Sequence, residues 1–241
     1  MKKNILFISI CSFLISSCSS FDTNPTSKPP SYSEIKLQEM FENISEGQQE
    51  LQDGDLVVRR GRDMISYTIR QFNRTDHFYS HAGIVFYENN KPYIYHIYPN
   101  DKDTGTQFFK DSLRVFADPF KNDGYAIYRY NLNSTELQQL KTNVLFWYHK
   151  KVRFDMKFDQ RTDQEMYCSE MIRKMLLKST HNRINIKEDK LTVKEIKFFA
   201  NKLNIPESEG DNRKIVAIDN LYLNPNCKFI QRFVYDSSLV R

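Results

Sequence analysis

A β-hairpin pattern between residues 81 and 98 is the feature that most restricts how this chain can fold. Residues 82–87 and 93–98 are rich in β-branched and aromatic side chains, and Glu88-Asn89-Asn90-Lys91 between them has turn chemistry. Pro92 stands at the start of the second run, where a missing backbone donor is tolerated. A tight turn at Asn89-Asn90 therefore predicts two antiparallel strands with a fixed register.

This register places two histidines on one face of the hairpin. Gly83 faces His96 and His81 faces Tyr98, and residues opposite each other project from the same side of a sheet. His81 and His96 are then diagonal neighbours, about 5–8 Å apart at the backbone. This spacing lets His96 hydrogen-bond to His81 and orient its ring.

Helices and strands follow one another in blocks along the rest of the chain. Amphipathic spacing predicts helices over 33–47 (capped by Ser33), 63–72, 111–116, 133–148, 166–177 and 192–203. Short apolar runs predict strands over 56–58, 125–130, 215–218 and 229–235. This order favours an α+β domain, with a mostly antiparallel sheet packed against helices.

The N-terminus has the layout of an export signal. Two lysines precede an apolar run over residues 5–15, and Ile15-Ser16-Ser17-Cys18 resembles a bacterial lipobox, whose cysteine becomes an acylated N-terminus. We expect a lipoprotein of the bacterial cell envelope, held at the membrane by lipid on Cys18; the alternative is an ordinary signal peptide that contains a cysteine. The predicted division is a lipoprotein signal peptide over 1–17, a flexible tether over 18–32 and a folded domain over 33–241.

Composition argues against several other classes of protein. The formal charge is +5, and without the two leader lysines 33 basic residues stand against 30 acidic ones, which gives no indication of a nucleic-acid partner. The seven glycines form neither G-x-G-x-x-G nor G-x-x-x-x-G-K, so a glycine-cradled nucleotide site is not expected. No C-x-x-C pair exists, and structural zinc and thioredoxin-like redox chemistry therefore lack their usual signature.

Cys168 is the candidate nucleophile. It opens a helical pattern, and a thiol in the first turn of a helix meets the positive end of the dipole, which is expected to lower its pKa. With His81 as base and His96 orienting that base, the set has the logic of a thiol hydrolase, and the Cys168 backbone N–H can serve an oxyanion. Spacing alone does not join these residues, so a packed, unreactive cysteine and core-filling histidines are the alternatives.

The other cysteines and histidines are expected to have no part in catalysis. Cys11 is removed with the leader, Cys18 is the predicted lipid anchor and Cys227 has no assigned role, so no disulfide is expected. His77-x-x-x-His81 has the spacing of a helical metal pair. It runs into a predicted strand, however, and lacks the Glu of H-E-x-x-H, so no metal site is predicted.

Four short segments occur in the order found in NlpC-type papain-fold hydrolases. LQDGDLV (51–57) resembles their opening strand, and SHAGIV (80–85) resembles their histidine strand. RFDMKFD (153–159) and YCSE (167–170) resemble the segment leading into their nucleophile helix. Histidine before cysteine matches the circularly permuted branch, the YiiX/YebB-like cysteine hydrolases. The resemblance, over residues 51–235, implies a circularly permuted papain-like (NlpC-type) fold.

This resemblance also implies a site and a reaction. Cys168 becomes the nucleophile, His81 the general base and His96 the third polar residue, a position where relatives often have Glu; Asp55 holds the start of its strand rather than reacting. The implied reaction is hydrolysis of an amide or peptide bond through a thioacyl-enzyme, without metal or cofactor. Peptidoglycan stem peptides or related small amides are the expected substrates. The alternatives are an acyltransferase or lipid hydrolase with the same site, and a non-catalytic envelope binding lipoprotein.

Overall fold

The structure, a computed structural model, describes residues 31–99, 107–210 and 212–235. The predicted signal peptide and Cys18 lie outside these residues. Ser31 caps the first helix, α1 (Tyr32–Glu50): its side chain accepts from the Glu34 backbone N–H, and the Glu34 carboxylate accepts from the Ser31 N–H. The predicted cap at Ser33 is therefore wrong, because this reciprocal pair begins two residues earlier.

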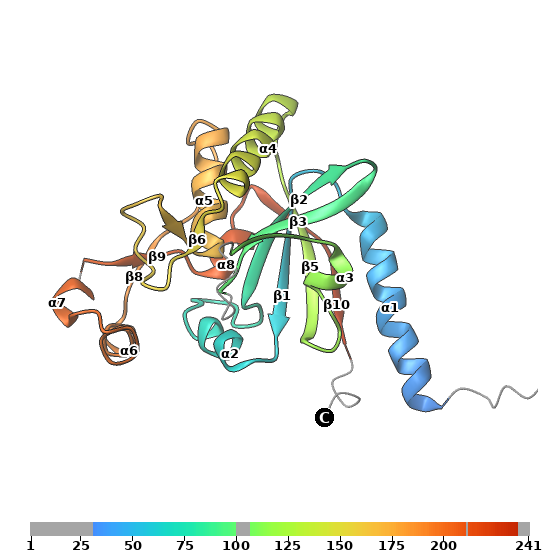
Figure 1. The fold of residues 1–241 in the computed structure, drawn as a ribbon, viewed down its shortest axis with the longest axis horizontal. Coiled ribbons are helices and arrows are strands. Elements are labelled where there is room, and N and C mark those ends of the chain that lie inside the picture. The colour runs from blue at the N-terminus through green and yellow to red at the C-terminus, as the bar shows by residue number, and fades with distance from the viewer. Residues whose placement is uncertain (1–30, 100–106, 211, 236–241) are drawn as a thin grey trace, which may run out of the picture.

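A six-stranded sheet forms the centre of the fold (Figure 1). Each neighbouring pair of strands in it is antiparallel. In spatial order, the strands are β10 (Cys227–Val234), β5 (Asn122–Tyr130), β1 (Asp55–Gly61), β2 (His81–Glu88), β3 (Lys91–Ile97) and β4 (Phe108–Asp111).

The predicted hairpin and its register are confirmed in β2 and β3. Glu88 lies opposite Lys91, and Ile84 lies opposite Tyr95. The two asparagines between the strands, Asn89-Asn90, have φ angles of 49° and 61°. Two consecutive positive φ angles are typical of a type I′ turn, whose twist matches that of the flanking strands.

Helices cover both faces of the sheet, so the predicted α+β class is confirmed (Figure 1). Alternation along β1 sends Leu56 and Val58 to one core and Val57 to the other. The first core packs against α4 (Ser134–His149), α5 (Cys168–Ser179) and α8 (Ile218–Tyr222). The second packs against α1 and α3 (Leu113–Phe116).

The parallel pair β6 (Arg153–Phe154) with β7 (Glu165–Met166) contributes Phe154 and Met166 to the first core. A lobe that contains α6 (Val193–Leu203), α7 (Glu207–Gly210) and the strand pair β8 (Asp189–Lys190) with β9 (Lys214–Ile215) lies beside the sheet, at the left of Figure 1. A small core that includes Phe72 and Phe199 joins this lobe to the segment after α2 (Met64–Arg70).

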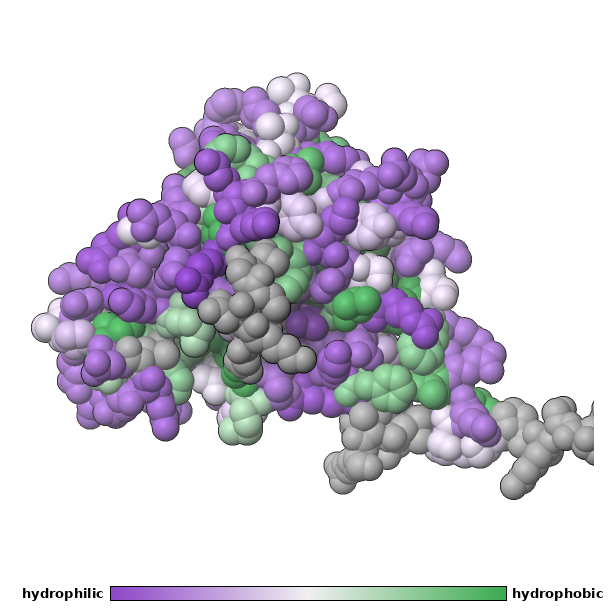
Figure 2. Space-filling view, in the orientation of Figure 1, coloured by the Kyte–Doolittle hydropathy of each residue, from purple (hydrophilic) through white to green (hydrophobic). Residues whose placement is uncertain are grey.

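The face seen in Figure 2 is mainly hydrophilic, with small, separate hydrophobic patches. No described helix has both the length and the hydrophobicity to span a bilayer.

Two sequence expectations about local structure are wrong. Residues 108–111 form β4 at the edge of the sheet, so the helix expected over 111–116 is reduced to α3. The strand expected over 215–218 ends at Ile215, and α8 begins at Ile218. Both segments are too short for the spacing of apolar residues to distinguish a helix from a strand. Their structure depends on the strands and helices that they contact, which lie elsewhere in the chain.

Candidate active site

His81 and His96 share a direct hydrogen bond, as the hairpin register predicts. His81 begins β2 and His96 lies near the end of β3, with His81 Nε2 2.9 Å from His96 Nδ1. Both side chains are buried. The other ring nitrogen of His81, Nδ1, takes no part in this hydrogen bond. It lies at the end of the sheet where α5 begins.

A carboxylate that the sequence did not indicate follows on the far side of His96. His96 Nε2 lies 3.1 Å from Asp111 Oδ2 at the end of β4. In the register of β3 and β4, His96 faces Phe109, so Asp111 is its diagonal neighbour on the same face. A polar chain consequently runs across three adjacent strands, from His81 through His96 to Asp111.

Aromatic rings enclose both imidazoles. The His81 ring lies 5.1 Å from Tyr98 and 5.5 Å from Phe116, and the Phe116 ring also lies 5.0 Å from His96. Burial in this environment lowers the pKa of His81 well below its ordinary value, and the charge of Arg59 lowers it further. Burial also lowers the pKa of His96, although Asp111 acts in the opposite direction. Both imidazoles are therefore harder to protonate than an ordinary histidine.

Arg59 brings a positive charge to the site from the neighbouring strand. It lies opposite His81 in the pairing of β1 and β2, and its guanidinium donates to the Phe116 carbonyl at 2.8 Å. The guanidinium also lies 5.3 Å from the centre of the Tyr98 ring. Its charge lowers the pKa of the Cys168 thiol as well as those of the two histidines.

Cys168 lies in the first turn of a helix, as predicted, and its thiol is buried. It is the first residue of α5, which begins two residues later than the expected start at residue 166. The Ala82 and Ser169 backbone N–H groups donate to Sγ, so the thiol lies beside the residue that follows His81. These bonds lower the pKa of the thiol, but burial outweighs them and raises it to about 11. The predicted lowering of this pKa is therefore wrong, because the position at the helix start does not compensate for desolvation.

The order of these elements along the chain, with the histidine strand before the cysteine helix, agrees with a family match. Residues 50–230 match the model of a family described as permuted papain-like amidase enzyme, YaeF/YiiX, C92 family. The chain belongs to this family. It is therefore a cysteine hydrolase of the peptidase and amidase class, and the predicted family and permuted fold are confirmed.

A solved structure supports the fold assignment of this amidase. It is the crystal structure of metalloprotein YiiX from Escherichia coli O157:H7, which superposes with a TM-score of 0.59. The match covers 76% of this chain and 98% of that chain, at 18% sequence identity, and at this identity it shows a shared fold. No curated protein matches the sequence.

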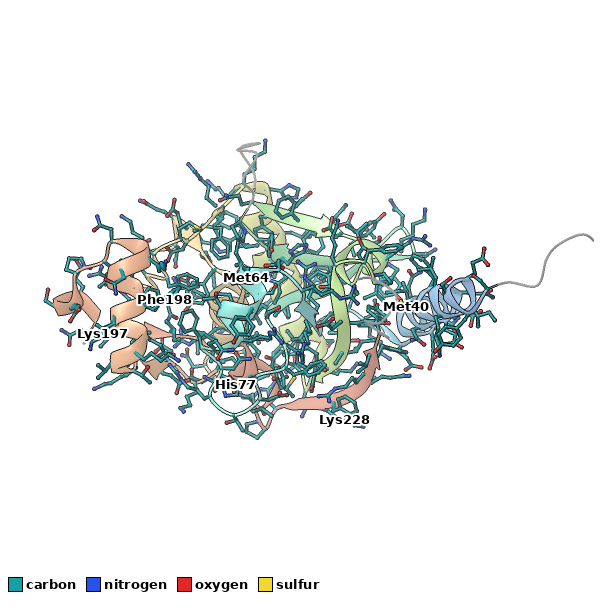
Figure 3. All side chains as sticks on the ribbon, turned by 90° about the horizontal axis from the view of Figure 1, so that it is seen from below. Met40, Met64, His77, Lys197, Phe198 and Lys228 are labelled. Carbon is teal, nitrogen blue, oxygen red and sulfur yellow. The ribbon has the colours of Figure 1, made fainter. Side chains whose placement is uncertain are left out.

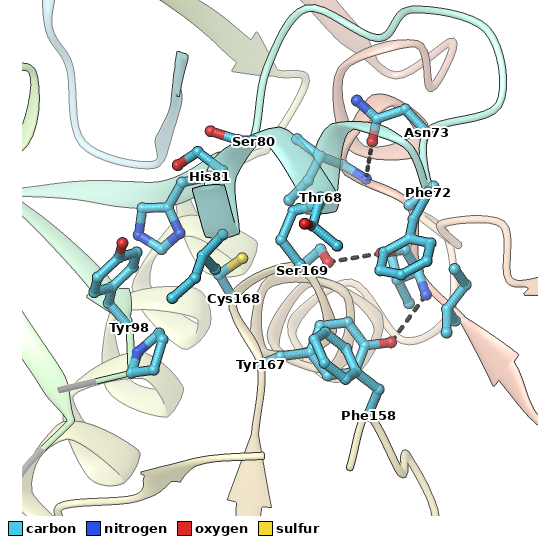
Figure 4. A pocket seen from close by; sticks show the side chains of 18 of the residues that line it. Thr68, Phe72, Asn73, Ser80, His81, Tyr98, Phe158, Tyr167, Cys168 and Ser169 are labelled. Carbon is cyan, nitrogen blue, oxygen red and sulfur yellow. Dashed lines mark hydrogen bonds between the residues drawn. The ribbon is translucent and has the colours of Figure 1, made fainter. Parts of the chain in front are cut away.

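A cavity of about 270 Å³ opens beside Cys168 and His81 in the amidase (Figure 4). We call one side of the cavity the histidine wall. Its His81 side chain lines the cavity, and the other members of this wall, which support His81 without lining the cavity, are His96, Asp111 and Arg59. The other side, the apolar wall, consists of Met64, Ile65, Ile69, Phe72, Phe154, Met156, Phe158, Phe198, Ile215 and Val216. Two of its members, Met64 and Phe198, lie on the face seen from below in Figure 3. Among the described residues, no Asp, Glu, Lys or Arg lines this cavity.

Buried hydrogen bonds hold the apolar wall against the start of α5, as the dashed lines in Figure 4 show. Ser169 Oγ donates to the Val216 carbonyl at 2.7 Å, and the Val216 N–H donates to the Tyr167 hydroxyl at 2.9 Å. The Ile218 N–H donates to Asn73 Oδ1 at 3.1 Å. The segment between β9 and α8 is thus fixed directly beside Cys168.

The other residues considered in the sequence take positions outside this cavity. Asp55 accepts two hydrogen bonds from Arg129, at 2.6 and 2.8 Å, in keeping with a role in holding β1. His77 is bonded through Nδ1 to the Arg70 carbonyl, and Cys227 is a free thiol on β10. The described His, Cys, Asp and Glu side chains include no group of three or more placed to hold a metal ion.

Proposed function

We propose that the amidase cleaves its substrate through a thioacyl intermediate on Cys168, with His81 as general base and His96 as the residue that orients His81. The observation that carries this proposal is that the α5 thiol and the β2 imidazole line one cavity, while His81 Nε2 is already bonded to His96. Since His81 Nε2 is engaged, Nδ1 is the nitrogen that takes the thiol proton.

Acylation starts from a neutral pair rather than from a preformed ion pair. The raised pKa of Cys168 and the lowered pKa of His81 keep thiol and imidazole uncharged at neutral pH. His81 Nδ1 accepts the thiol proton as Sγ attacks the carbonyl carbon of the amide. The resulting oxyanion is stabilised by backbone N–H groups at the start of α5 and by the positive charge of Arg59. His81 then returns the proton to the leaving amine as the C–N bond breaks.

Deacylation repeats these steps with water as the nucleophile. His81 removes a proton from the water molecule as its oxygen attacks the thioester carbonyl. The C–S bond then breaks, and the proton returns to the Cys168 sulfur. The products are a carboxylic acid and the amine released in the first step. Transfer of the acyl group to an alcohol or another amine would use the same intermediate, with that nucleophile in place of water.

The apolar wall supports a substrate whose acyl part is apolar. A neutral lining of Phe, Ile and Met side chains stabilises hydrocarbon by removing it from water. It offers no ionic partner to the charged groups of a peptidoglycan stem peptide. We therefore favour an N-acyl amide over the cell-wall peptides expected from the sequence. A lipid anchor on Cys18 would hold the enzyme at a membrane, where substrates of this kind accumulate.

Substrate profiling with three proteins tests this function. The wild type, Cys168→Ala and the matched control Cys227→Ala are assayed against N-acyl amides of increasing chain length and against stem peptides, with mass detection of acid, ester and amine products. We expect the wild type and Cys227→Ala to hydrolyse the acyl amides, and Cys168→Ala to be inactive. Turnover by Cys168→Ala at the wild-type rate would overturn the thiol mechanism, and cleavage of stem peptides alone would overturn the substrate assignment.

A further inference from the structure

Asp111 belongs to the histidine wall but has no role in the reaction described so far. It lies beyond His96 from the cavity, and the side chain is 29% exposed, so it does not touch the reacting atoms. Its described polar partner is His96 Nε2, while the other ring nitrogen of His96 faces His81. His96 is thus held at both nitrogens, between a carboxylate and an imidazole.

Hydrogen-bond chemistry fixes where the protons of this chain lie. An ionised carboxylate can only accept, so His96 must donate from Nε2 to Asp111. Neutral His96 then has a lone pair on Nδ1 and accepts from His81. His81 must consequently carry its proton on Nε2, which leaves the lone pair on Nδ1, the nitrogen that remains to take the proton of Cys168.

We infer that Asp111 is a positioning residue that acts through His96 to set the tautomer of His81. The inference rests on the proposed roles of Cys168 and His81. Without the carboxylate, His96 is free to carry its proton on either nitrogen. In the form with a proton on Nδ1, it donates to His81 Nε2, and the His81 proton moves to Nδ1. A ring protonated there cannot act as the base for Cys168.

Neutral tautomers are the relevant species because the surroundings disfavour protonation of either ring. Arg59 disfavours a positive charge on both histidines, His96 disfavours one on His81, and Asp111 favours one on His96. Phe109, Phe116 and Tyr98 supply the rest of the enclosure. Asp111 therefore acts through the direction of hydrogen bonds, while the histidines stay uncharged.

Long-range 1H–15N NMR spectra of protein labelled at histidine test the inference, together with kcat and KM on an N-acyl amide. In the wild type we expect His81 and His96 to be protonated at Nε2. In Asp111→Ala we expect His81 to populate the Nδ1-protonated form, and kcat to fall about 10- to 100-fold with KM little changed, the loss that is typical when a carboxylate that orients a metal-bound histidine is removed.

Glu88→Ala is the matched control. Glu88, the last residue of β2, also accepts hydrogen bonds across this sheet, from Lys110 on β4 at 2.7 Å and from the Tyr95 hydroxyl on β3, but it does not contact a histidine. We expect its NMR tautomers and kcat to match the wild type. The inference is wrong if Asp111→Ala keeps the wild-type tautomers, whatever its rate, or if Glu88→Ala loses as much kcat.

If Asp111→Ala does not fold, the wild-type spectrum still tests the inference. A proton on His81 Nδ1 in the wild type would contradict it. Failure of the proposed function is seen separately, as activity that survives in Cys168→Ala. The spectra report the proton positions whether or not a substrate has been found, so the two failures are distinguishable.

Discussion

The two walls of the cavity are built by different means. In the histidine wall, neighbouring strands hold Arg59, His81, His96 and Asp111 in register, and hydrogen bonds of 2.9 and 3.1 Å join the last three. In the apolar wall, side chains from segments far apart in the sequence meet through packing. Under the proposed function, this difference corresponds to a division of labour, in which the hydrogen-bonded histidine wall supports the chemistry and the apolar wall supports the choice of substrate.

The largest effect is expected from removing the base in the histidine wall. His81→Ala should lower kcat/KM by roughly 10²–10⁴-fold, the usual contribution of a positioned general base. His77→Ala is the control, because His77 is an exposed histidine bonded only to the Arg70 carbonyl in the described contacts. Steady-state kinetics and thermal melting of both variants check the prediction. A fully active, folded His81→Ala protein would remove His81 from the mechanism.

A second prediction concerns the thiol, which lies where the two walls meet. Only the thiolate is alkylated, and burial raises the pKa of Cys168 to about 11, so the thiolate fraction at pH 8 is about 10⁻³. Below its pKa, the alkylation rate should rise about tenfold per pH unit and continue to rise past pH 9, where an ordinary cysteine levels off. Peptide mapping of iodoacetamide-treated Cys227→Ser protein measures the profile. A plateau near or below neutral pH would instead indicate a preformed thiolate–imidazolium pair.

The smallest effect is expected at the rim of the apolar wall. Met156 lines the cavity and is 52% exposed, so Met156→Lys puts a charge where an acyl chain would lie without disrupting the core. We expect kcat/KM to fall roughly tenfold for long-chain acyl amides and little for short-chain ones. Phe120→Lys is the control, since Phe120 is equally exposed but does not line the cavity. Equal loss for short and long chains would contradict the proposed division of labour.

Much of the histidine wall could be predicted from the sequence because local chemistry determines it. The Asn89-Asn90 turn fixes one register, and that register brings His81 to His96. Arg59 and Asp111 could not be found in this way. Which strand adds to each side of the hairpin depends on partners distant in the chain, and the four residues of β4 carry little periodic signal of their own.

The sequence indicated less about the thiol and the apolar wall. Position at the start of a helix was predictable for Cys168, but its pKa is dominated by burial, which depends on the whole fold. Tertiary packing also determines the position of Val216 in the apolar wall. Its backbone is bonded to Tyr167 and Ser169, residues almost fifty positions earlier in the chain, instead of continuing β9 as a regular strand. A short apolar run does not encode such a contact.

Mass mapping of the acyl-enzyme tests the central claim most directly. The wild type is mixed with an N-acyl amide, quenched in acid during turnover, digested and analysed for added acyl mass. We predict the acyl group on the peptide that contains Cys168, as a thioester that disappears once substrate is exhausted. An acyl group attached instead to Cys227 or to another side chain would contradict the account.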